Sequence, residues 1–137
     1  MPPKAVIFDL DGTLVDTLAD IGNAMNVVLA GYGVPPVPLE AYRSRVGWGL
    51  KELARRTIPE EILKTTPFEA IAEAFHDAYA AKPLDHTYVY PGMESVVTDL
   101  RNNNIRMAVF SNKPDGLVSP IVDHFFSGVF GWVRGSV

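Results

Sequence analysis

The feature that most constrains the fold is a short apolar run, Ala5-Val6-Ile7-Phe8, that ends at two aspartates and a glycine. A continuous apolar run of this length favours a buried strand of a parallel sheet. Asp9 and Asp11 then lie at the carboxyl end of the strand, where such sheets bind ligands. Gly12 lets the chain turn there, so the two carboxylates can face one ligand from different directions. The alternative is a solvated turn, because Asp and Gly are common turn residues.

Composition narrows the class of protein. With 137 residues and 47% hydrophobic content, the chain can form a packed core of about one domain. No apolar stretch approaches the roughly 20 residues of a membrane span, and the first residues show no signal-peptide pattern, so we expect a cytoplasmic protein that does not bind membranes. The absence of cysteine excludes disulfides and thiolate sites. A net charge of −4 without a basic cluster argues against nucleic-acid binding.

The order of elements predicts an α/β fold with an insertion. Residues 18–81 show helical periodicity and no strand signal, whereas residues 105–110 form the next apolar strand segment and a third follows near the C-terminus. The helical block at residues 18–81 is too long for a loop and indicates an inserted helical domain. We expect a core from 1–16, a helical domain from 17–84, and the continued core from 85–137. A single irregular α/β domain is the alternative.

The run from Asp9 to Thr17, DLDGTLVDT, resembles the first signature of the haloacid dehalogenase-like hydrolases, and its DGTLVDT part resembles their phosphoglycolate-phosphatase-like branch. The resemblance implies a Rossmann-like three-layer core with a parallel sheet and an inserted all-helical cap. It also implies a phosphatase in which Asp9 forms an aspartyl-phosphate and Asp11 acts as general acid and base. The substrate would be a small phosphorylated metabolite, a phosphate monoester such as phosphoglycolate.

An acidic strand end repels a phosphate group unless a cation lies between them. We therefore expect Mg²⁺ at Asp9 and Asp11, because this ion prefers carboxylate and phosphate oxygens. A phosphomutase of the same family would use the same pair of acids. A phosphoacceptor receiver would also combine aspartate with magnesium, but the helical insertion argues against it.

A second polar cluster follows the strand that ends at Phe110. Ser111 and Asn112 resemble the second signature of the family, in which a hydroxyl after a buried strand binds the transferring phosphoryl group. We expect both residues to bind phosphate, with Lys113 only a neighbour, because the family's catalytic lysine comes from a later segment. An ordinary helix N-cap before Pro114 is the alternative.

The segment Arg45-Val46-Gly47-Trp48-Gly49-Leu50-Lys51 lies between predicted cap helices. It resembles the glycine-containing specificity loop of capped family members, in which Arg45 or Lys51 could meet a substrate carboxylate. Gly47 and Gly49 would allow a close backbone approach. A plain interhelical turn with Trp48 packed inward is an equal alternative.

Two parts of the family pattern have no match before Val137: the later lysine and the acidic motif that completes the metal site. The resemblance thus covers only the N-terminal portion of a complete enzyme, and the core would be incomplete. The chain is then part of a longer phosphatase, works with a second chain, or is a non-catalytic binding module that keeps the fold. An unpaired sheet edge would favour self-association or pairing with a missing C-terminal segment.

Overall fold

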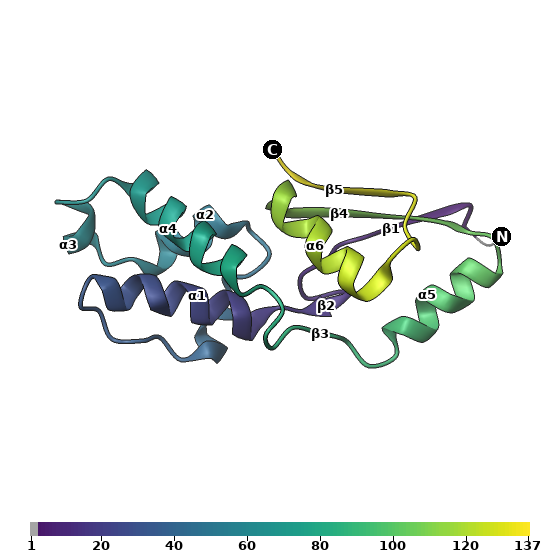
Figure 1. Ribbon diagram of the computed structural model, residues 1–137, viewed down its shortest axis with the longest axis horizontal. Coiled ribbons are helices and arrows are strands. Elements are labelled where there is room, and N and C mark those ends of the chain that lie inside the picture. Colours follow the sequence, from purple (N-terminus) through teal and green to yellow (C-terminus); the bar gives the residue numbers. More distant parts are fainter. Residues whose placement is uncertain (1–2) are drawn as a thin grey trace. The chain divides into compact units, whose positions relative to one another are not determined.

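Parallel strands form the main sheet of the protein (Figure 1). The computed structural model describes residues 3–137, and its main sheet has the order β1-β4-β5. Its strands are β1 (Ala5–Phe8), β4 (Arg106–Pro114) and β5 (Trp132–Ser136). Both strand pairs are parallel. The α/β class with a parallel sheet, predicted from the apolar runs, is confirmed.

Two helices connect these strands: α5 (Met93–Asn102) precedes β4, and α6 (Asp115–Phe126) lies between β4 and β5. Because both crossovers advance in the same direction across the sheet, right-handed connections place both helices on the same face. Side chains on that face are buried, including Phe8, Met107 and Val109. The apolar side of α6 covers them with Leu117, Val118, Ile121, Val122 and Phe126.

The opposite face of the sheet is exposed in the residues that the structure describes. Burial alternates along β1 and β4, and Ile7 retains 69% of its surface. The expectation of a buried strand at Ala5–Phe8 therefore fails for the side of the strand that carries Ile7. The reason is topological, because a strand order that advances in one direction covers a single face with its crossover helices.

A separate helical unit comprises Thr17–Thr87. Its elements are α1 (Leu18–Gly31), the 3₁₀ helix η1 (Leu39–Tyr42), α2 (Leu50–Thr57), α3 (Glu60–Leu63) and α4 (Phe68–Ala81). Its interior includes Ile21, Met25, Leu29, Tyr42, Leu53, Ile71, Phe75 and Tyr79. Gly22 permits the close approach of η1, because a Cβ there would lie 2.7 Å from Leu39 Cδ2. Within residues 3–137, no helix combines the length and apolarity needed to cross a membrane.

The sheet unit contains the residues up to Asp16 together with Tyr88–Val137, so the second boundary lies between residues 87 and 88. The sequence placed that boundary between residues 84 and 85. Asp20 explains the difference, because its carboxylate accepts hydrogen bonds from the backbone N–H of His86 (2.9 Å) and the hydroxyl of Thr87 (2.7 Å). These bonds hold the last residues of the segment on the helical unit.

A short antiparallel ribbon, absent from the sequence prediction, lies at the boundaries of the sheet unit. Its strands are β2 (Val15–Asp16) and β3 (Tyr88–Val89). The Tyr88 hydroxyl donates a hydrogen bond of 2.9 Å to Asp16 Oδ2. The two points at which the chain passes between units are thus paired with each other.

Candidate active site

The loop after β1 presents the two aspartates. The carbonyl oxygen of Leu10 accepts hydrogen bonds from the backbone N–H groups of Leu14 (3.0 Å) and Val15 (3.2 Å), which closes a tight turn. Gly12 has a φ of +80°, a conformation that favours glycine. The side chains of Leu10 and Leu14 are fully buried and anchor the loop. Apolar anchoring therefore fixes a loop whose polar residues lie at the carboxyl end of β1.

Asp9 is exposed to solvent, and its Oδ1 accepts a hydrogen bond of 2.8 Å from the N–H of Leu10. Partial burial of the carboxyl group raises its pKa, and the negative charge of Asp11 adds to this increase. The Leu10 hydrogen bond and the positive charge of Lys113 act in the opposite direction. Asp9 is thus the accessible carboxylate of the pair, as a nucleophile must be.

Asp11 forms a buried ion pair with Lys113. The distance from Lys113 Nζ to Asp11 Oδ1 is 2.8 Å, and the two side chains are 0% and 8% exposed. Sequence reasoning treated Lys113 only as a neighbour, whereas the structure makes it the charged partner of the second aspartate. The missed signal was the alternation of β4, which continues past Phe110 and places Lys113 on the buried side with Val109 and Ser111.

Ser111 and Asn112 lie within β4, which continues to Pro114 rather than ending at Phe110. The Ser111 side chain is buried, and its Oγ accepts a hydrogen bond of 3.1 Å from the N–H of Lys113. Asn112 is exposed, between two buried neighbours. The structure therefore places Ser111 on the same side of β4 as Lys113, the partner of Asp11, and does not place Asn112 with them.

The end of β5 closes against the start of α6. Gly135 donates a backbone hydrogen bond of 2.8 Å to Asp115 Oδ1. A Cβ at Gly135 would lie 2.6 Å from the Cα of Asp115 and would also collide with the carbonyl of Lys113. Only glycine lets β5 approach the segment that carries Ser111 and Lys113.

The expected specificity residues lie in the helical unit. Arg45 donates a hydrogen bond of 2.9 Å to Thr57 Oγ1, and Lys51 forms an exposed pair of 3.6 Å with Glu69. Gly47 and Gly49 both have positive φ, at 108° and 91°. Trp48 is 65% exposed, so its inward packing, one of the two alternatives from sequence, is wrong. The Arg56 guanidinium lies 5.5 Å from the centre of the Trp48 ring.

The donors at the site suit magnesium in kind, and their number leaves several positions of the ion for other ligands. Asp9 and Asp11 supply carboxylate oxygens, and Lys113 engages one oxygen of Asp11. No group of three or more His, Cys, Asp or Glu side chains that could hold a metal ion occurs in residues 3–137. An octahedral magnesium ion at Asp9 and Asp11 would take its remaining ligands from water, from a substrate phosphate or from residues outside this part of the chain.

Comparison with known proteins is consistent with this geometry. The model of the haloacid dehalogenase-like hydrolase family matches residues 6–129. The phosphoglycolate phosphatase of Pseudomonas putida is 39% identical over 138 residues, which cover 97% of this chain and 50% of the relative. Phosphoglycolate phosphatase 1 of Pseudomonas aeruginosa is 37% identical with the same coverage.

Solved structures show the same fold. The crystal structure of a predicted phosphoglycolate phosphatase from Haemophilus somnus superposes with a TM-score of 0.88 and 26% identity, and the match covers 97% of this chain and 62% of that one. The chain thus spans about half the length of the curated relatives it matches.

Proposed function

Because the chain belongs to the haloacid dehalogenase-like hydrolase family, we propose that it forms the nucleophile-bearing part of a phosphatase. The substrate is a small phosphate monoester such as phosphoglycolate, the compound in the names of its relatives. One observation carries the proposal: an exposed Asp9 lies two residues from an Asp11 that is buried and paired with Lys113. One acid is free to attack, and the other is held in place for proton transfer.

The proposed reaction has two steps. The first step requires Asp11 in its protonated form: a carboxylate oxygen of Asp9 attacks phosphorus, the ester P–O bond breaks, and the leaving alkoxide takes the proton of Asp11, which is left as the carboxylate paired with Lys113. Asp11 then accepts a proton from water, whose oxygen attacks the aspartyl-phosphate and releases inorganic phosphate and Asp9. The Ser111 hydroxyl is the donor we assign to a non-bridging phosphate oxygen. Asn112, exposed on β4, is assigned this role only from the resemblance.

Magnesium would be held by Asp9 and Asp11, and it would offset the negative charge of the phosphate. The remaining acidic ligands and the family's later lysine would come from outside this chain. We therefore expect the chain alone to bind magnesium weakly and to hydrolyse phosphate esters at or near the background rate.

We assign the role of a cap to the helical unit, Thr17–Thr87. Arg45 and Lys51 are the cations near Gly47 and Gly49 that could pair with a substrate carboxylate. We also expect a cytoplasmic location, where small phosphorylated metabolites are found.

A chimaera tests the proposed function. Residues 1–137 are joined to the second half of the Pseudomonas putida relative, which this chain does not cover. We expect turnover of phosphoglycolate that depends on magnesium, and a covalent phosphate that disappears in Asp9→Asn. Retention of more than a few per cent of activity in that variant would contradict the role of Asp9. A folded chimaera without turnover would instead favour the non-catalytic alternative.

A further inference from the structure

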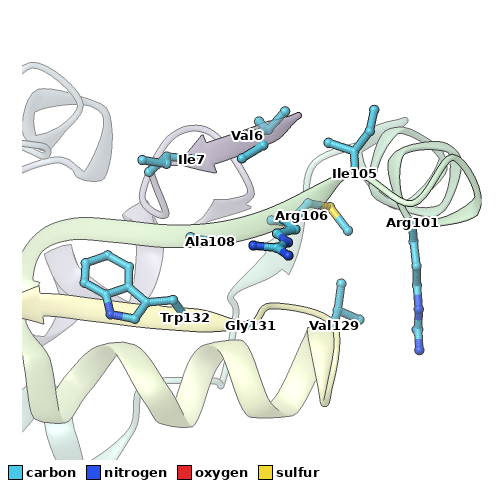
Figure 2. Close-up of a pocket in the computed structure, with 11 residues that line it drawn as sticks. Val6, Ile7, Arg101, Ile105, Arg106, Ala108, Val129, Gly131 and Trp132 are labelled. Carbon is cyan, nitrogen blue, oxygen red and sulfur yellow. The ribbon is translucent and has the colours of Figure 1, made fainter. Parts of the chain in front are cut away.

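The strands β4 and β5 pair regularly over the first part of their length. Ala108 pairs with Trp132, and the register continues without a shift to Phe110 and Arg134. Figure 2 shows this regular part, with Ala108 on β4 and Trp132 on β5. The ladder of backbone hydrogen bonds is sufficient to align the two strands here.

The register shifts at the end of the two strands, beside the proposed site. The next partners are Pro114 and Ser136. Residues 111–113 of β4 therefore lie opposite the single residue Gly135 of β5, and we call these β4 residues the bulge. A β-bulge disrupts the ladder locally and redirects side chains, and bulges are common beside active sites. The regular ladder thus does not fix the position of the bulge.

The bulge carries two side chains of the proposed site, and both are buried. Lys113 extends to Asp11, with its Nζ 2.8 Å from Asp11 Oδ1. Ser111 Oγ accepts a hydrogen bond of 3.1 Å from the backbone N–H of Lys113, so the two residues are also joined within the bulge. A displacement of the bulge backbone would therefore move the Lys113 ammonium group away from Asp11 and would redirect the Ser111 hydroxyl.

Asp115 connects the end of the bulge to β5. It is the first residue of α6, directly after Pro114. Its Oδ1 accepts a hydrogen bond of 2.8 Å from the backbone N–H of Gly135, the residue opposite the bulge. The backbones are in close contact there, because a Cβ at Gly135 would collide with the carbonyl oxygen of Lys113 and lie 2.6 Å from the Cα of Asp115. The carboxylate of Asp115 thus holds β5 at the point where the register shifts.

Stabilisation of α6 is the other role that Asp115 could have. A negative charge in the first turn of a helix is favourable, because the helix N-terminus carries a partial positive charge. That role needs only the charge of Asp115 and does not need an oxygen directed at Gly135. The hydrogen bond of 2.8 Å between them favours a connection between the bulge and β5.

We propose that Asp115 is a positioning residue of the candidate active site. Its hydrogen bond to Gly135 fixes the bulge, and the fixed bulge holds Lys113 against Asp11 and directs the Ser111 hydroxyl. Asp115 itself makes and breaks no bond in the reaction. The positioning role rests on the proposed phosphatase function, whereas the connection between Asp115 and β5 can be tested without it.

Hydrogen exchange of the 137-residue chain, measured by NMR, tests this connection without an activity assay. In Asp115→Ala the N–H groups of Gly135 and Lys113 should exchange roughly tenfold faster, because the bulge opens more easily. The N–H groups in the regular part of β4 should keep their rates. Asp115→Asn should restore most of the protection, because its amide oxygen accepts the same hydrogen bond. Asp123→Ala, at an exposed acid of the same helix, is the matched control.

The kinetics of the chimaera test the positioning role. Asp115→Ala should lower kcat for an alkyl phosphate about 10–100-fold, because small displacements of catalytic groups have effects of this size. The loss should be smaller for an aryl phosphate, since its leaving group depends less on a correctly placed Asp11. A loss of folded protein would instead affect both substrates equally. Asp115→Asn should recover most of kcat, and Asp123→Ala should leave it unchanged.

The proposal is overturned if Asp115→Ala keeps the exchange rates of Gly135 and Lys113, or if its kinetic loss is the same for both substrates. It is also overturned if Asp115→Asn behaves like Asp115→Ala, because the charge at the start of α6 would then matter and the hydrogen bond would not. A chimaera that is inactive without any substitution contradicts the proposed function. In that case the exchange rates of Gly135 and Lys113 alone decide whether Asp115 fixes the bulge.

Discussion

The two units of the protein differ in the burial of their ion pairs. The helical unit has several ion pairs that are solvent-exposed, among them Glu40–Arg43, Lys51–Glu69, Glu52–Arg56 and Glu61–Lys64. In the sheet unit the pair of Asp11 and Lys113 is buried, at 2.8 Å. Large apolar side chains are exposed in both units, such as Ile7 and Trp132 in the sheet unit and Val27 and Trp48 in the helical unit.

This difference in burial bears on the stability of the helical unit and on the role of the sheet unit. Exposed ion pairs contribute roughly 0–1 kcal/mol, so the helical unit depends on its apolar interior for stability. A buried pair gains little over apolar residues of the same volume, because both charges lose their hydration. The presence of such a pair beside Asp9 therefore favours a chemical role for the sheet unit.

The largest effect expected from this comparison concerns Asp11. In the chimaera, Asp11→Asn should lower kcat for an alkyl phosphate about 10²–10⁴-fold, because general acid and base catalysis contributes this much. The loss should be smaller for an aryl phosphate, whose leaving group needs less protonation. Steady-state kinetics with both substrates checks this. Equal losses would assign Asp11 a structural or metal-positioning role.

Lys113→Met tests the buried pair directly. The substitution leaves the charge of Asp11 buried without its lysine, and it should lower the free energy of unfolding by about 3–5 kcal/mol in urea titrations. Lys51→Met removes an exposed partner and should change stability by less than about 1 kcal/mol. Adding Asp11→Asn to Lys113→Met should recover part of the loss. Similar effects of the two lysine variants would remove the contrast between the units.

Tyr42 provides a pH-dependent test of the helical unit. Its hydroxyl donates a hydrogen bond of 2.7 Å to Asn26 Oδ1, and burial raises its pKa to about 12. The folded state keeps the proton more tightly than the unfolded state, so this stabilisation is complete below pH 10 and is lost as the pH rises toward 12. The loss is on the order of 2 kcal/mol.

Thermal unfolding between pH 8 and pH 11, followed by the circular dichroism of the helices, measures this effect, with Tyr42→Phe as the control. The variant should be less stable at pH 8 by about 1 kcal/mol, because it lacks the hydrogen bond. It should also show a shallower decrease at high pH. Parallel pH profiles for the two proteins would exclude Tyr42 as the cause.

The smallest effect is expected for the proposed cap residues. In the chimaera, Arg45→Ala or Lys51→Ala should raise KM for phosphoglycolate roughly tenfold, or about 1.4 kcal/mol, and hardly change KM for an aryl phosphate. The reason is that these cations would bind the carboxylate rather than the phosphoryl group. Lys64→Ala, another exposed lysine of this unit, is the matched control. A uniform change with both substrates would support a plain turn at Gly47-Trp48-Gly49.

The sequence alone determined the strand-and-aspartate loop and the helical block, because both depend on local patterns. An apolar run followed by Asp9, Asp11 and Gly12 constrains the backbone within a few residues. The helical periodicity between residues 18 and 81 is likewise read from near neighbours. The roles of these residues in catalysis remain predictions.

Only the tertiary structure decided which distant residues meet. The pairing of Lys113 with Asp11 depends on the register of β1 with β4 and on the length of β4, and neither is encoded in a local pattern. The hydrogen bonds from His86 and Thr87 to the Asp20 carboxylate depend on tertiary structure for the same reason, because these residues lie 66 and 67 positions after Asp20 in the chain. The exposure of one face of the main sheet follows from strand order. The apolar run predicts that Ile7 is buried, but its side chain is exposed because both crossover helices lie on the other side of the sheet.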